Sequence, residues 1–350
     1  MSHYESRLDF NCVTAVINFP TPKPLDQQFE FELSSPAFRL QSLPMTMENI
    51  DALKKNPREG GRLAYKLKNA NVFVSKNGFH FIDYLDPVED IPPEVDASQL
   101  TDEVAAYIET QLQANAKKFD TQANIVKAHL PLQDAKVLDI GCGGGLFLSL
   151  LKQQGAEVIG IELSDSRARY AKVKHGLVIE KHPIENEYWQ SGYATHFDAV
   201  TLWDVIEHVN YPLQTLQSAA RVLKQGGLLL IDTPCRDSFY HRFGALTYRL
   251  SGGRFPTFLN AMYSSHLFGH KQIFSTSEMK RLFESVGFEV IDLHKFHELS
   301  FPYEFYLKKL FKSQLLVNVI LPFVKLFFKV FKIQNKMLVV GKKRFDYGSR

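Results

Sequence analysis

Cysteine is scarce in this sequence. The three cysteines, Cys12, Cys142 and Cys235, lie far apart, and none belongs to a CxxC pair. Zinc ribbons and disulfide scaffolds need paired or closely spaced cysteines, so both classes of protein are excluded. A reducing, cytoplasmic setting fits this composition best.

Long uncharged hydrophobic runs are also missing. The longest candidate, residues 313–324, contains Asn318 and Pro322 and falls short of the roughly 18 apolar residues that a membrane-spanning helix requires. The N-terminal segment contains Glu5 and Asp9 and leads into no apolar run. We therefore predict neither a membrane span nor a signal peptide.

The chain has no overall excess of charge of one sign, with 41 basic and 38 acidic residues. This balance argues against a protein that coats nucleic acid by charge, so we predict no nucleic-acid partner. Only residues 306–350 are strongly basic, with nine lysines and two arginines against the single acid Asp346.

Two parts of the chain differ in pattern. Residues 1–100 are rich in proline, and their clearest signal is a hairpin, with apolar segments at 72–75 and 79–84 around Asn77-Gly78. A proline-containing linker over 86–93 follows. We expect residues 1–100 to be an accessory region.

From Thr101 onward, short apolar segments alternate with segments of helical composition. This rhythm predicts βαβ units and an α/β domain over 101–343, with a mostly parallel sheet covered on both faces. The rhythm stops at an aromatic insertion over 236–270, which we expect to be a substrate lid, and residues 344–350 form a tail. The expected strands are 136–140, 157–161, 177–180, 197–202, 228–232, 289–293 and 337–340, and the expected helices are 102–129, 146–154, 164–174, 212–223 and 277–286.

A glycine-rich loop, residues 141–145, joins the first of these strands to a helix. Glycines let a ligand approach the backbone closely, and the helix N-terminus points amides at it. Glu162 follows the second strand, where a carboxylate can accept both hydroxyls of an adenosine ribose. Leu146 stands where the dinucleotide fingerprint GxGxxG has glycine, which disfavours an NAD-linked oxidoreductase. Asp139, just before the loop, could pair with an ammonium group of a ligand.

Four sequence blocks occur in order: VLDIGCGGGLFLSLL, FDAVTLWDVIEHV, VLKQGGLLLIDTP and HKQIFSTSEMKRLFESVGFEV. Together they resemble the class I S-adenosylmethionine (SAM) dependent methyltransferases over roughly 101–343. Within that family they are most similar to the ubiquinone-biosynthesis O-methyltransferase-like, methyltransferase type 11 and 23 group. The resemblance implies a Rossmann-like seven-stranded sheet in the order 3-2-1-4-5-7-6, whose last strand, 337–340, is antiparallel.

The resemblance also implies SAM as the cofactor and places its binding roles on particular residues. The methionine part, the ribose, adenine and the sulfonium each fall to residues near the carboxyl ends of the first four strands. His182 to Ile184 offers no acid for the adenine amine, so backbone amides or Glu185 would recognise it. The implied cofactor residues are Asp139, Gly141 and Gly143 for methionine, Glu162 for ribose, Leu163 and Ile184 for adenine, and Leu202 and Trp203 for the sulfonium. Cys142 belongs to the same loop, and Lys118 is expected from its position upstream to reach the methionine carboxylate.

Methyl transfer needs alignment of donor and acceptor, and the acceptor must lose a proton. Asp204, Glu207 and His208 follow the fourth strand at i, i+3 and i+4, which would place them on one face of a helical turn. The similar quinone O-methyltransferases bind a divalent metal with such a cluster, so a Mg or Zn site at these three residues is one interpretation. His208 as general base, with Glu207 beside it, is a second; a helix cap at Asp204 with a packed His208 is a third. His266 and His270, at the end of the insertion, are further catalytic candidates.

Residues 306–332 alternate apolar clusters with lysines, a pattern typical of a basic amphipathic helix. We interpret this segment first as the last helix of the sheet domain, with its apolar side in the core. Peripheral contact with the inner face of a membrane is the alternative, and it would suit a lipid-linked acceptor.

The sequence thus predicts a SAM-dependent methyltransferase that acts on a small molecule, on a hydroxyl of an aromatic, quinone-like, lipid-linked or glycan acceptor. A sugar or nucleotide-sugar N- or C-methyltransferase is one alternative. A SAM-binding or membrane-associated scaffold without catalysis is another.

Overall fold

The computed structural model describes residues 61–75, 78–87, 100–299, 302–311, 313–331 and 333–344. Seven strands form the main sheet, in the order β10-β11-β8-β7-β4-β5-β6. Strand β11 is antiparallel to both of its neighbours, and the pairs from β8 to β6 are parallel. The predicted strand order and antiparallel last strand are therefore confirmed. The strands are β4 (Lys136–Ile140), β5 (Glu157–Ile161), β6 (Val178–Glu180), β7 (Phe197–Trp203), β8 (Leu223–Pro234), β10 (Phe288–Phe296) and β11 (Lys336–Lys343).

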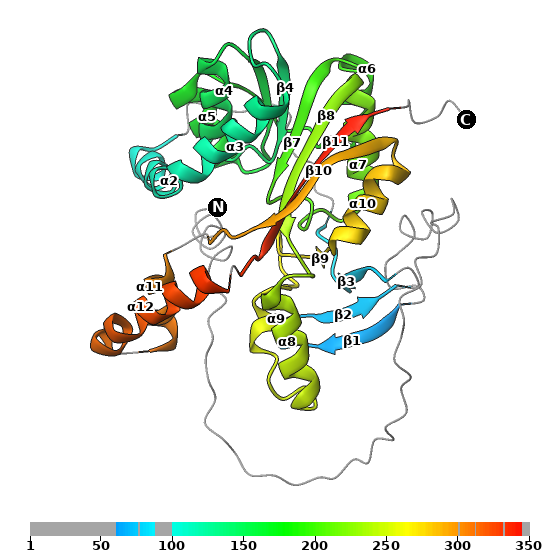
Figure 1. The fold of residues 1–350 in the computed structure, drawn as a ribbon. Coiled ribbons are helices and arrows are strands. Elements are labelled where there is room, and N and C mark those ends of the chain that lie inside the picture. The colour runs from blue at the N-terminus through cyan, green and yellow to red at the C-terminus, as the bar shows by residue number, and fades with distance from the viewer. Residues whose placement is uncertain are drawn as a thin grey trace.

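Helices cover both faces of this sheet (Figure 1). On one face, α3, α4 and α5 contribute Val126, Phe147 and Ala168 to an apolar core. On the other face, α7 and α10 contribute Leu216 and Leu282 to a second core. The helices of this domain are α2 (Asp102–Ala114), α3 (Ala116–His129), α4 (Leu146–Gln153), α5 (Asp165–His175), α6 (Glu187–Gly192), α7 (Pro212–Val222) and α10 (Thr276–Ser285).

The predicted helix over 102–129 is two helices, because the first one ends at Asn115. The Asn115 amide donates to Leu112 O, and its side-chain Nδ2 donates to Gln111 O at 2.9 Å. These bonds satisfy carbonyl groups that the end of α2 leaves without helical partners. Asparagine thus ends α2 and begins α3.

The N-terminal strands belong to a second, four-stranded sheet in the order β1-β2-β3-β9. The predicted hairpin is confirmed as β2 (Asn71–Val74) and β3 (His80–Ile82). Strand β1 (Arg62–Lys66) pairs with β2, and β9 (Gln272–Ile273), directly after the insertion, pairs with β3. The insertion itself contains α8 (Phe239–Leu250) and α9 (Thr257–Asn260).

The accessory strands and the insertion share one core, in which Val72 and Ile82 pack with Leu259 and Tyr263. The described part of the accessory region and the insertion therefore form one unit. Several predictions lie outside the described residues: the structure of residues 1–60, turn residue Asn77, most of the linker and the tail from residue 345.

The basic segment before β11 forms two helices, α11 (Tyr303–Leu310) and α12 (Gln314–Val330). The interpretation that its apolar side lies in the core is wrong. The helices lie beyond the ends of β10 and β11 (Figure 1), and on α12 Leu315 and Phe323 are 75% and 69% exposed. Within the described ranges, no helix has the length and apolar character needed to cross a membrane.

Candidate active site

The glycine loop after β4 is held by the acid at the end of β5. Glu162 Oε2 accepts a hydrogen bond from Gly143 N at 2.8 Å, and Oε1 accepts one from Ser164 N at 2.7 Å. Gly143 has a φ of +56°, and a Cβ built there would have nothing within 4 Å. The Cα of Gly143 therefore borders open space while its amide holds the carboxylate, as a ligand-binding loop requires. The structure brings together the two residues that the sequence singled out.

Asp139 lies buried beneath this loop. Thr201 Oγ1 donates to its Oδ1 at 2.6 Å, yet burial raises the pKa of the carboxyl to about 8. Asp139 is therefore protonated near neutral pH and could ionise when a cation arrives. The Cys142 side chain is also buried, and burial raises the pKa of its thiol. Only the backbone of this cysteine can therefore contact a ligand.

The residues predicted to border adenine and the sulfonium differ in burial. Ile184 and Leu202 belong to the main apolar core, with 2% and 0% of their surface exposed, so their side chains are committed to packing. Leu163 is half-buried. Trp203 packs edge-on against Phe147, with ring centroids 5.5 Å apart, and its Nε1 has no partner within the described ranges.

Asp204, the residue after β7, lies in a cluster of opposite charges. Lys118 Nζ lies 2.6 Å from its Oδ2, and Lys336 Nζ lies 2.7 Å from its Oδ1. Burial alone would raise the pKa of Asp204, but the two ammonium groups outweigh burial and hold the pKa well below its usual value. Lys336 Nζ also lies 3.0 Å from Asp232 and 2.8 Å from Glu298. The predicted cofactor residue Lys118 is therefore paired with protein carboxylates.

Sequence reasoning missed Lys336, Asp232 and Glu298. Asp232 stands within the apolar run of a strand, and Lys336 directly precedes the predicted last strand. A charge at such a buried position is a signal for a partner. Nothing in the sequence pattern pairs Asp232 with Lys336, since the two residues are 104 positions apart.

Glu207, His208 and His270 form a separate cluster. His208 Nε2 lies 3.9 Å from Glu207 Oε1, and the two histidine rings have centroids 4.7 Å apart. Thr233 Oγ1 donates to the other Glu207 oxygen at 2.9 Å. The structure thus unites three of the four predicted catalytic residues. The fourth, His266, is exposed, and its Nδ1 lies 3.0 Å from Leu267 O, outside this cluster.

The cluster is electrostatically suited to accept a proton. Burial, with the Asp204 carboxylate nearby, raises the pKa of Glu207 to about 7. Burial lowers the pKa of both His208 and His270 below the usual imidazole value, so both imidazoles are neutral at pH 7. His270 Nδ1 lies 3.1 Å from Met262 O, which can only accept a hydrogen bond, so Nε2 carries the lone pair of the neutral ring.

Lys271 and Gln272 hold the turn that carries Glu207 and His208. Lys271 Nζ donates to His208 O at 2.8 Å and to Asp86 Oδ2 at 2.7 Å, and its backbone amide donates to Glu207 O. Gln272 Nε2 donates to the carbonyls of Ile206 and Val209, at 3.1 and 2.7 Å. Sequence reasoning also missed these positioning residues, although they directly follow His270.

The geometry separates the three residues predicted to bind a metal. Glu207 and His208 group with His270, all with ligand atoms within 4.8 Å of one another, whereas Asp204 groups with Asp232 and Glu298. The lysine ammonium groups already neutralise the second set. The first set fits a divalent ion in donor type, and buried Glu207 Oε1 has no hydrogen-bond partner among the described residues. A metal held by Glu207, His208 and His270 would polarise an acceptor oxygen.

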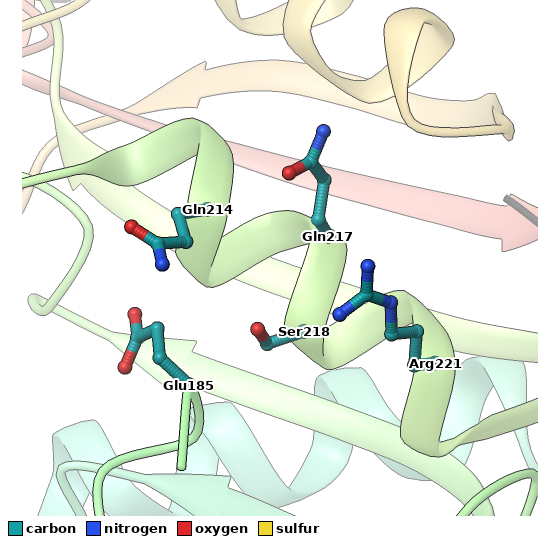
Figure 2. A pocket seen from close by; sticks show the side chains of 5 residues that line it. All are labelled: Glu185, Gln214, Gln217, Ser218 and Arg221. Carbon is teal, nitrogen blue, oxygen red and sulfur yellow. The ribbon is translucent and has the colours of Figure 1, made fainter. Parts of the chain in front are cut away.

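A pocket lies elsewhere, lined by α7 and by Glu185 from a neighbouring segment (Figure 2). None of the predicted catalytic or cofactor residues lines it. Glu185, considered above for adenine, lies there and accepts a hydrogen bond from the Thr215 hydroxyl of α7. The lining residues are Glu185, Gln214, Gln217, Ser218 and Arg221.

Comparison with known proteins gives consistent results. Residues 107–293, more than half of the chain, match the family model described as a methyltransferase domain. The ubiquinone biosynthesis O-methyltransferase of Azoarcus sp. (strain BH72) is 30% identical over 48% of this chain and 70% of its own. The enzyme of the same name from Stutzerimonas stutzeri (strain A1501) is 32% identical over 36% of this chain and 55% of its own. The chain thus spans only about half the length of several of these relatives.

Solved structures are similar at lower identity. The putative methyltransferase in complex with the Trm112 methyltransferase activator of Haloferax volcanii is 15% identical, with a TM-score of 0.48, over 71% of this chain and 99% of its own. The order of the sheet, the glycine loop with its acid and the match over 107–293 agree. The chain belongs to the SAM-dependent methyltransferase family.

Proposed function

We propose that this methyltransferase transfers the methyl group of SAM to a hydroxyl oxygen of a small aromatic or quinone-like acceptor, and that Glu207, His208 and His270 receive the hydroxyl proton. The observation that carries the proposal is their grouping, with one ligand atom of each within 4.8 Å of the others. Glu207 and His208 follow β7, the strand that pairs with β4 and so lies next to the glycine loop. A methyl acceptor must meet the sulfonium where these residues lie, at the carboxyl ends of the parallel strands.

The reaction is an in-line displacement at carbon. The acceptor oxygen forms a bond to the methyl carbon, the bond from that carbon to sulfur breaks, and S-adenosylhomocysteine leaves. The acceptor proton goes to the cluster, because a phenol with a pKa near about 10 is largely protonated at neutral pH. A base with a pKa close to 7, as burial gives Glu207, is matched to this task.

Two further observations support an aromatic acceptor hydroxyl. The relatives described above are named as O-methyltransferases of ubiquinone biosynthesis, which supports both oxygen as the acceptor atom and a quinone-like ring. The insertion that supplies His270 is rich in aromatic residues. On its helix α8, the rings of Phe239 and Phe243 stack 5.7 Å apart and remain partly exposed.

Turnover of 4-nitrocatechol by the full chain tests the proposal, with product identified by mass and S-adenosylhomocysteine quantified. We expect a methyl ether to form, and kcat to fall by about 10²–10⁴ in Glu207→Gln and His208→Asn. The wild-type rate should rise with pH toward a plateau above about 7, since the base must lose its proton, and Glu207→Gln should lack that limb.

The control is His294→Asn, a change of an exposed histidine on β10 that pairs with Asp292 and lies outside the cluster. It should retain wild-type kcat. Calorimetric SAM binding should be unchanged in the cluster variants, which separates a catalytic defect from misfolding. Methylation on carbon or nitrogen, or wild-type turnover by both cluster variants, would overturn the proposal.

A further inference from the structure

One face of α12 exposes apolar side chains to solvent. At about 100° per residue, the exposed positions fall within an arc of about 160° on the helix surface. A surface helix normally turns such a face to the core. The residues and their exposed fractions are Leu315 75%, Leu316 47%, Val319 56%, Phe323 69%, Leu326 58%, Phe327 43% and Val330 62%, continued by Phe331 64% at the C-cap.

The opposite side of α12 is packed, so the exposed face has a defined direction. Val317 is fully buried, and Phe328 packs on Tyr303 of α11 and on His297, with ring centroids 5.0 and 5.2 Å apart. The hydroxyl of Tyr303 lies 2.7 Å from His297 Nε2. The helix pair is thereby attached to the end of β10 and presents its apolar face outward.

The charge of this segment has one sign. Between residues 303 and 332 the sequence contains six lysines and one acid, Glu304. Lys308 and Lys325 are exposed, and Lys308 Nζ lies 2.9 Å from Glu304 on the same helix. At 100° per residue, Lys325 lies about 80° outside the apolar arc, on the other side of the helix, so α12 carries a described positive charge apart from its apolar face.

We propose that the exposed apolar face of α12 binds an anionic membrane surface, with α12 lying in the interface. A helix with an apolar arc on one side, in a segment whose charge is almost all positive, suits lipid tails and anionic headgroups together. A second copy of the chain is a poorer occupant, because it would bring together two segments that each carry six lysines and one acid. The aromatic helix α8 lies at the same end of the molecule (Figure 1), so the bound membrane would lie near the insertion.

Co-sedimentation of the full chain with vesicles tests this proposal without any substrate. We expect binding to vesicles of phosphatidylcholine with phosphatidylglycerol, little binding to phosphatidylcholine alone, and weaker binding at high salt. The double variant Phe323→Ser and Phe327→Ser should weaken partitioning by at least about tenfold. The double variant Lys308→Gln and Lys325→Gln should have a similar effect on anionic vesicles.

Val173→Ser is the matched control, because Val173 is 50% exposed on the distant helix α5. It should bind vesicles like the wild type, and all variants should bind SAM equally. Wild-type partitioning by the phenylalanine variant would overturn the proposal. A dimer in sedimentation equilibrium without lipid, dissociated by the same variant, would also overturn it and assign the face to self-association.

Discussion

At the scale of single residues, Lys336 is the cation around which three carboxylates gather. Its Nζ lies within 3.0 Å of Asp204, Asp232 and Glu298. Burial would lower the pKa of this ammonium, but the carboxylates outweigh burial and raise the pKa well above its usual value. Burial raises the pKa of Asp232 to about 6 even with Lys336 beside it. The ion pairs therefore depend on the lysine.

Lys336→Met should destabilise the fold by about 3–5 kcal/mol at pH 7, because it leaves buried carboxylates without their cation. The loss should shrink at pH 5. Without the lysine, the buried carboxyls have raised pKa values and bind protons as the pH falls, which removes the uncompensated charge. Urea unfolding at both pH values measures the effect.

Lys342→Met is the control on the same strand, since Lys342 is exposed. It should change the free energy of unfolding by no more than about 0.5 kcal/mol. Equal effects of the two substitutions would contradict the role given to Lys336.

At the scale of elements, the loop between β4 and α4 combines a left-handed backbone with open space. Gly143→Ala should cost about 1–2 kcal/mol for the positive φ. It should also weaken SAM binding by at least about tenfold, because the new methyl group would occupy the space where we expect the ligand.

Gly176→Ala provides the comparison. Gly176 ends α5 with a φ of +58°, and a Cβ there also meets nothing within 4 Å. It should have the same cost in unfolding free energy and no effect on SAM affinity, measured by calorimetry. Equal SAM affinity in the two variants would mean that Gly143 does not border the ligand.

The elements that the sequence predicted well are those with local signals. Strands 136–140 and 157–161 occur at their predicted bounds, since each is an apolar run with a glycine or acid at its end. The break at Asn115 was missed because asparagine is only mildly unfavourable in a helix. Strand β9 was missed because a two-residue strand has no periodicity to detect.

At the scale of the whole molecule, the sequence did not predict which distant segments contact each other. His80 pairs with Ile273 across almost two hundred residues, and Asp86 meets Lys271. A pattern of apolar residues identifies a strand but not its partner. The exposed face of α12 was misread for the same reason, because an apolar face looks alike in sequence whether protein or another surface covers it.

The membership of Glu207 and His208 in one cluster followed from their spacing, and His270 was selected for its place at the end of the insertion. The spacing did not predict that Asp204 lies apart from Glu207 and His208. Asp204 has a φ of +55°, so the turn after β7 does not begin as a regular helix, and the i, i+3, i+4 spacing fails at its first residue. Lys118 and Lys336 come from distant segments and fix its side chain there.

The central claim is that SAM lies against the glycine loop and Glu162, with Asp139 facing its ammonium group. Calorimetric titration of the full chain with SAM at pH 7, in two buffers of different ionisation enthalpy, tests it most directly. The account predicts binding with proton release, because Asp139, with a pKa of about 8, must ionise to pair with the ligand's ammonium group. Glu162→Ala, folded as judged by urea unfolding, should bind at least about tenfold more weakly. Absence of a binding heat with SAM and with S-adenosylhomocysteine, or wild-type affinity in Glu162→Ala, would contradict the claim.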